Sequence, residues 1–290
     1  MRELAAGSRS NSPILLTIRR IISYAVLILL TFLCLFAFYI LIINSTRAHP
    51  DIQKSFSFLP GKSLLVNLKN VLKNENLPVL SGIRNSLFVS TSVAAFSTYF
   101  SAMTAYGIYA YDFKYKKAAF TFIMLIMMVP TQVSALGFVR LMVSMGLRDS
   151  FAPLIIPSIA SPIVFFFMKQ YMESSLPLEI IEAARMDGSN ELRTFNTIVI
   201  PIMKPAIAVQ AIFTFVGAWN NYFMPALLLD SKNKKTLPIL IAQLRSADFL
   251  KFDMGQVYVL IAVAIIPVII VYLLLSKFIV RGVTLGSVKG

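Results

Sequence analysis

Residues 21–43 read IISYAVLILLTFLCLFAFYILII, and no charged side chain interrupts them. At about 1.5 Å per residue a helix over this run reaches roughly 35 Å, which is enough to cross a bilayer with some tilt. The basic pair Arg19-Arg20 precedes it. A secretory signal peptide also has a basic start, but its apolar part is usually only about 7 to 15 residues long. The run therefore predicts a retained first transmembrane helix.

The composition extends this prediction to the whole chain. Of 290 residues, 57% are hydrophobic and only 14% are charged, which is too little polar surface to cover a soluble globule. Five further segments are long enough to span a membrane and nearly free of charge: residues 85–111, 118–139, 151–168, 206–229 and 257–276. The sequence predicts an all-α integral membrane protein with six transmembrane helices.

The polar segments define the remaining organisation. We expect an N-terminal tail at 1–20, a loop at 44–81, a core of five transmembrane helices at 82–276 and a C-terminal tail at 277–290. In the first loop Leu64, Leu68, Val71 and Leu72 fall at helical spacing, which predicts a short amphipathic helix at the membrane interface. Basic residues flank the short connections and favour cytoplasmic termini and an extracytoplasmic 44–81 loop: Arg19, Arg20, Lys114, Lys116 and Lys117.

Several classes of function are disfavoured by what the chain lacks. The net charge of +14 sits between apolar runs, where Lys and Arg contact anionic lipid headgroups, so nucleic acid is not an expected partner. One cysteine, Cys34, and one histidine, His49, leave no disulfide and no Cys or His metal site. Gly61-Lys62-Ser63 matches the end of a phosphate-binding loop, but Phe56 stands where that loop requires glycine. We therefore expect no nucleotide, metal or catalytic residue in this chain.

The predicted spans also lack ionisable side chains at their centres, which disfavours a proton-coupled transporter and an intramembrane hydrolase. Their neutral amides and hydroxyls either line a path for a solute or join helices to one another. The cluster at 219–223 is either an interfacial aromatic anchor or a surface for sugars, which offer C–H faces and hydroxyls. The candidate pathway residues are Thr131, Gln132, Trp219, Asn220, Asn221 and Tyr222.

A polar island at 169–205 is too long for a simple turn. Ser174, Ser175 and Pro177 predict a helix start, Gly188 predicts its end, and Ser189 opens a second helix. We expect Ile180, Ile181 and Ala184 to share one face. The Ala183-Ala184 pair leaves a shallow surface that a partner's groove can approach, and the alternative is a plain connector resting on lipid headgroups.

The island resembles the signature of bacterial ABC importer permease subunits, which reads Glu-Ala-Ala, three residues, Gly, nine residues, Ile-x-Leu-Pro. The matching positions are Glu182, Ala183, Ala184, Gly188, Ile198 and Pro201, with Ile200 in place of Leu. Residues 219–225 and 281–290 are similar to the carbohydrate branch of this family, specifically its MalG-like half. In that half the residue after Trp-Asn is usually acidic, and here it is Asn221.

The resemblance implies a type I ABC importer transmembrane domain in the bacterial inner membrane, carrying a sugar or oligosaccharide. Its expected partners are a second homologous permease, two cytoplasmic ATPase subunits that bind ATP and Mg, and an extracytoplasmic solute-binding protein. The island would be the coupling helix, with Glu182 as the charged contact, Ala183 and Ala184 as close packing, and Gly188 as the turn. Asp187 and Pro201 complete the expected coupling set. The alternatives are an ABC importer for a peptide or polyol, or a secondary transporter or channel.

Overall fold

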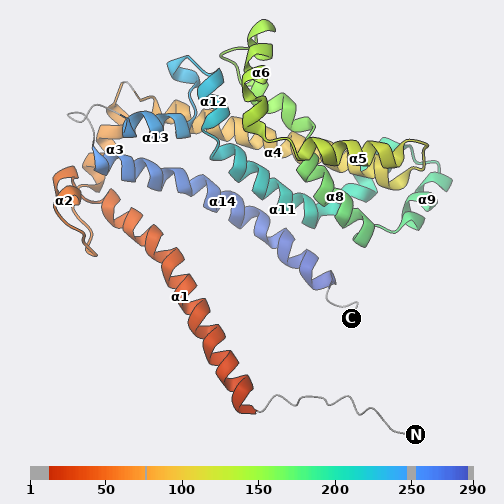
Figure 1. The fold of residues 1–290 in the computed structure, drawn as a ribbon, viewed down its shortest axis with the longest axis horizontal. Coiled ribbons are helices and arrows are strands. Elements are labelled where there is room, and N and C mark those ends of the chain that lie inside the picture. The colour runs from red at the N-terminus through yellow and green to blue at the C-terminus, as the bar shows by residue number, and fades with distance from the viewer. Residues whose placement is uncertain (1–12, 76, 247–252, 287–290) are drawn as a thin grey trace.

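The computed structural model describes residues 13–75, 77–246 and 253–286, and every regular element in these ranges is a helix (Figure 1). Five helical stretches are long and apolar enough to cross a membrane, and a sixth is present if one sharply bent pair counts as a span. This confirms the all-α membrane fold. The predicted tails fall partly outside the description, at residues 1–12 and 287–290.

The long helices are α1 (Pro13–Ser45), α4 (Val79–Ala110), α11 (Ile200–Trp219) and α14 (Met254–Gly286). The shorter elements that connect them are α2 (His49–Lys54), α3 (Leu64–Lys73), α5 (Lys116–Met127), α6 (Thr131–Ser144), α7 (Ala152–Ile155), η1 (Ile156–Ile159), α8 (Pro162–Ser175), α9 (Leu178–Met186), α10 (Glu191–Thr194), the π-helical turn η2 (Phe195–Val199), α12 (Phe223–Leu228), η3 (Lys232–Lys234) and α13 (Leu237–Arg245).

Helix α4 lies at the centre of the bundle and packs on α11 and α8. Its buried face consists largely of small side chains, including Ala94, Ser101, Ala102 and Ala105. Small residues allow neighbouring helix backbones to approach closely, which is how helices associate where lipid removes the hydrophobic drive. One core cluster surrounds Phe195 near α9, and a second surrounds Trp219 toward α13 and α14.

Helix α1 diverges from the bundle toward its amino end and packs chiefly on α14 (Figure 1). Most of its side chains are exposed. It begins at Pro13, so the helix includes residues that the sequence assigns to the N-terminal tail.

The predicted third span at 118–139 is not one continuous helix. Helices α5 and α6 meet at an angle of 95° across residues 128–130. Pro130 has no backbone N–H to continue the helix, and its ring disfavours helical geometry at the preceding Val129. The apolar run is therefore two helices, of which α6 turns away from α5.

The predicted fifth span at 206–229 is also misplaced, because α11 begins at Ile200 and ends at Trp219. The π-helical turn η2 leads directly from α10 into α11. This wider turn lies just before Pro201, whose ring would otherwise clash with the carbonyl of Thr197. The predicted fourth span, 151–168, is divided among α7, η1 and α8 at Pro157 and Pro162, and α8 continues to Ser175.

Two other helices are also longer than predicted. Helix α4 begins at Val79 rather than 85, and α14 continues past 276 to Gly286. The predicted loop helix is present as α3, with Val71 and Asn67 buried against the protein and Leu64 and Leu72 exposed. The Asn67 side chain donates to the carbonyls of Ser45 and Arg47 at 3.0 and 2.9 Å, which holds α3 against the chain.

Candidate functional site

Helix α9 projects at one end of the bundle (Figure 1). Its inner face places Ile181 and Ala184 in the core, three residues apart. Ile180 is 39% exposed, so the prediction that it shares this face is wrong, because consecutive helical residues point about 100° apart. For the same reason only Ala183 of the alanine pair lies at the surface.

The outer face of α9 presents Glu182, Ala183 and Met186 to solvent, with Asp187 directly after the helix. Met186 is 89% exposed, so nearly all of its side chain is accessible to a partner. Leu178 and Ile180 are partly exposed on the two opposite flanks of α9. Sequence analysis missed Met186, although its position four residues after Glu182 predicts the same helix face.

Gly188 turns the chain sharply after α9. Its φ is +78°, and its N–H donates to the Arg185 carbonyl while Ser189 N–H donates to the Ala184 carbonyl, both at 3.0 Å. This paired arrangement ends helices with a left-handed residue, which glycine adopts without strain. The following helix is capped by Asn190 rather than the predicted Ser189, because the Asn190 side chain accepts from Arg193 N–H at 2.9 Å.

A polar cluster ties α9 and α10 to the end of α4. The Arg185 Nε lies 2.8 Å from Glu191 Oε1, and the Tyr106 hydroxyl donates to Glu191 Oε2 at 2.7 Å. The Arg185 guanidinium also lies 4.8 Å from the centre of the Tyr111 ring. Its hydrogen bond to Glu191 raises the pKa of Arg185 above its ordinary value. We call these four residues the Arg185 cluster; no sequence motif pointed to it.

Pro201 is exposed at the start of α11. The turn before it is anchored by the buried Phe195, whose ring centre lies 5.6 Å from that of Tyr106. Pro201 therefore lies on the segment that joins α9 and α10 to a membrane-spanning helix.

A cavity of about 910 Å³ lies among α4, α6, the α7–η1 segment, α11 and α12. Each long helix contributes one face at helical spacing: Val89, Val93 and Ser97 come from α4, and Thr214 and Gly217 come from α11. Helix α6 contributes Thr131, Ser134, Ala135, Gly137 and Phe138, and it does so because the chain bends before Thr131.

The predicted pathway residues separate into different places. Thr131 and Asn221 line the cavity, whereas Gln132 and Asn220 are exposed and do not line it. Trp219 is 2% exposed, stacks on Phe215 at 5.9 Å and donates its indole N–H to the Ala264 carbonyl of α14 at 3.1 Å. Tyr222 borders a separate depression of about 280 Å³. The residues of the 219–223 cluster therefore do not share one surface.

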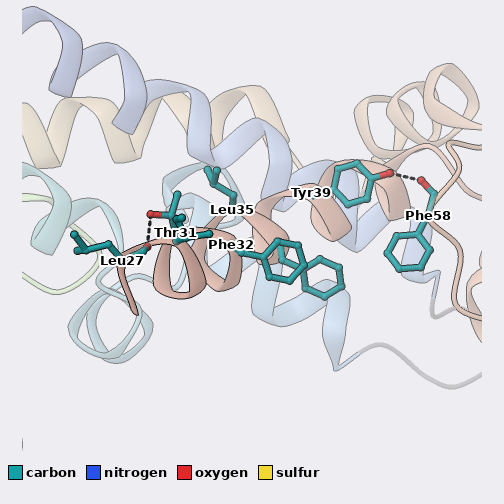
Figure 2. A pocket seen from close by; sticks show the side chains of 8 residues that line it. Leu27, Thr31, Phe32, Leu35, Tyr39 and Phe58 are labelled. Carbon is teal, nitrogen blue, oxygen red and sulfur yellow. Dashed lines mark hydrogen bonds between the residues drawn. The ribbon is translucent and has the colours of Figure 1, made fainter. Parts of the chain in front are cut away.

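A second hollow, of about 600 Å³, lies along α1 (Figure 2). Its lining is almost entirely apolar, and both hydroxyls in it are satisfied: Thr31 donates to the Leu27 carbonyl at 2.8 Å and Tyr39 donates to the Phe58 carbonyl. An apolar hollow on an exposed transmembrane helix suits hydrocarbon contact rather than a polar solute. Among the described residues no group of three His, Cys, Asp or Glu side chains could hold a metal ion.

Comparison with known proteins gives a consistent result. Residues 97–285 match the family described as binding-protein-dependent transport system inner membrane component. The chain is 39% identical over 209 residues to the arabinooligosaccharides transport system permease protein AraQ of Bacillus subtilis (strain 168), covering 71% of this chain and 72% of that one. It is 28% identical to the trehalose/maltose transport system permease protein MalG of Thermococcus litoralis, covering 94% and 98%.

The fold is also similar to that in the crystal structure of a bacterial ABC transporter involved in the import of the acidic polysaccharide alginate. The TM-score is 0.77 at 23% identity, covering 93% of this chain and 98% of that chain. Together with the long apolar helices, this likeness supports the all-helical membrane fold.

Proposed function

Because the chain belongs to the family of binding-protein-dependent transport system inner membrane components, we propose that it forms half of the sugar pathway of an ATP-driven importer. The other half is a second homologous permease. Two cytoplasmic ATPase subunits drive the cycle, and an extracytoplasmic solute-binding protein delivers the solute. Both termini and α9 lie on the cytoplasmic side.

The observation that carries this proposal is the outer face of α9. One exposed apolar side chain, Met186, bordered by Glu182 and Asp187, suits a protein interface with an apolar anchor and charge at its rim. Ala183 permits close approach of an ATPase cleft. Ala184 acts from the inner side by seating α9 on the core, and Gly188 sets the angle of the helix that leads to Pro201 and α11.

The solute class follows from the relatives and the cavity together. Relatives named for arabinooligosaccharides and for trehalose and maltose support a sugar or oligosaccharide. The cavity bordered by Thr131 and Asn221 supports a polar, uncharged path on the α6 and α11 side of this subunit. Gln132, Asn220 and Tyr222 are left as outlying contacts to the second permease or the binding protein.

The experiment is the substitution Glu182→Lys in the complete importer, reconstituted with its binding protein in vesicles. Charge reversal at a rim contact should lower solute uptake roughly tenfold while the subunit still inserts and assembles. Asp112→Lys, which changes an exposed carboxylate at the same end of the bundle but outside α9, is the matched control and should leave uptake unchanged.

Gly188→Val tests the turn independently. Valine at φ +78° costs on the order of 1–2 kcal/mol and displaces α10 relative to α9, so the number of solutes imported per ATP should fall. Normal uptake in both Glu182→Lys and Gly188→Val would contradict the assignment of α9, and uptake without any ATPase subunit would contradict the importer.

A further inference from the structure

Ser97 is a buried hydroxyl that faces the cavity. It lies on α4 in line with Val89 and Val93 and is 1% exposed, and its Oγ has no hydrogen-bond partner among the described residues. Other hydroxyls of the same helix do find partners: Ser90 donates to the Ser86 carbonyl at 2.6 Å and Thr98 donates to the Ala94 carbonyl at 2.7 Å. A buried polar group without a partner is costly, so a hydrogen-bonding group that enters the cavity would satisfy Ser97.

Three other hydroxyls around the cavity can accept a hydrogen bond from a solute. Ser134, Ser158 and Thr214 donate to backbone carbonyls three or four residues earlier in the chain at 3.1, 2.6 and 2.7 Å. Their protons are thus used, but each oxygen can still accept a hydrogen bond. These acceptors, beside the Asn221 amide on the same lining, are complementary to a solute that carries many hydroxyl groups.

The rest of the lining is apolar and uncharged. Phe138, Pro157 and Ala218 offer surfaces that suit the C–H faces of a sugar ring. No described residue that lines the cavity carries a charge, so a carboxylate or phosphate would lose its water without gaining a counter-charge from this subunit.

We propose that Ser97 is a direct solute contact and that this cavity selects an uncharged polyhydroxylated solute over an acidic one. The inference rests on the proposed function, since it requires that solute pass along this face of α4. It assigns to this subunit its own specificity-determining contact.

The experiment uses the single cysteine of the chain. In a Cys34→Ser background, Ser97→Cys is introduced into the complete importer and labelled with a neutral methanethiosulfonate. Arabinotriose delivered by the binding protein should slow labelling at least fivefold, whereas trigalacturonate at the same concentration should not. Thr91→Cys, at an exposed position of the same helix but outside the cavity lining, is the control and should label at a rate that neither sugar changes.

Kinetics provide a second measurement. Ser97→Ala should raise the KM for arabinotriose uptake several-fold with little change in kcat, Ser97→Thr should restore it, and Ser90→Ala should leave it unchanged. Protection by both sugars, protection by neither, or an unaltered KM in Ser97→Ala would overturn the inference. ATPase activity that the binding protein stimulates in the Cys34→Ser parent reports the proposed function separately: its absence would count against the importer, whatever happens at Ser97.

Discussion

At the scale of single residues, Asp149 joins two loops at the end of the bundle opposite α9. Its φ is +53°, a left-handed geometry that Asp and Asn tolerate better than other side chains. The carboxylate accepts from the N–H groups of Asp230 and Ser231, each at 2.9 Å, and lies 3.2 Å from the Lys234 ammonium. Residues 145–151 and 229–234 are thereby held together, over the α6 and α12 side of the cavity.

The hydrogen bonds from the Ser231 hydroxyl and backbone hold the pKa of Asp149 well below its usual range. A carboxyl whose pKa is lowered by folding contributes stability above its unfolded value and loses it as pH falls through the lowered value. We therefore expect amide hydrogen exchange at 229–231 to show constant protection between about pH 5 and 8. A loss of protection within that range would contradict the assignment.

Asp149→Asn keeps the backbone geometry but removes the charge. With allowance for solvent screening we expect a loss of about 1 kcal/mol, seen as roughly fivefold faster exchange of the Ser231 amide. Asp230→Asn removes only the exposed ion pair with Arg148, whose atoms lie 2.7 Å apart, and should change exchange little. Equal effects from the two substitutions would mean that the charge of Asp149 is unimportant.

At the scale of elements, the Arg185 cluster joins three helices that must move together if α9 is to act on the pathway. Glu191 accepts from both Arg185 of α9 and Tyr106 of α4, so it fixes the angle between α9, α10 and the central helix. The π-helical turn η2 follows at once and is a suitable place for bending, because its hydrogen bonds are less regular than those of an α-helix.

Tyr106→Phe removes one hydroxyl from this cluster and should reduce uptake per ATP hydrolysed several-fold, because α9 then moves partly without α4. In a double-mutant cycle with Arg185→Met, we expect a coupling free energy of about 1 kcal/mol in uptake. The control is Tyr99→Phe on the same helix as Tyr106, where the exposed Tyr99 hydroxyl donates to Asn196 Oδ1 of η2 at 3.2 Å. Strictly additive effects of Tyr106→Phe and Arg185→Met would show that the cluster does not act as a unit.

At the scale of the whole molecule, α11 is held between α4 and α14, and Trp219 marks this packing. It is the single tryptophan of the chain and is buried rather than interfacial. The hydrogen bond from its indole N–H to the Ala264 carbonyl joins α11 to α14 on one side, while the cavity lies on the other side of α11.

The intrinsic fluorescence of Trp219 should therefore be blue-shifted and nearly insensitive to iodide, in the assembled importer as in the isolated subunit. In a Trp219→Phe background, Asn220→Trp places an indole one residue later at an exposed position and should be readily quenched. Similar quenching of the two would refute the buried position of Trp219.

Long apolar runs and short local motifs were sufficient to predict the membrane helices and the turn after the polar helix. Residues 21–43 predict a spanning helix because hydrocarbon forces the backbone to satisfy its own hydrogen bonds. Gly188 predicts the turn after α9 because its cause lies within a few residues. The predicted helix ends were less accurate. Apolar composition shows that a segment lies in the membrane, but it does not show where the helix axis bends, as it does at Pro130.

By itself, then, the sequence determined the membrane class, the helix content and the position of the polar helix, all of which depend on neighbours in the chain. Only the tertiary structure decided that Trp219 packs on α14, that Asn221 and Thr131 share a cavity with Ser97, and that Tyr106 meets Glu191. The physical reason is that these pairs are distant in sequence, and their meeting depends on the angles at which packed helices cross.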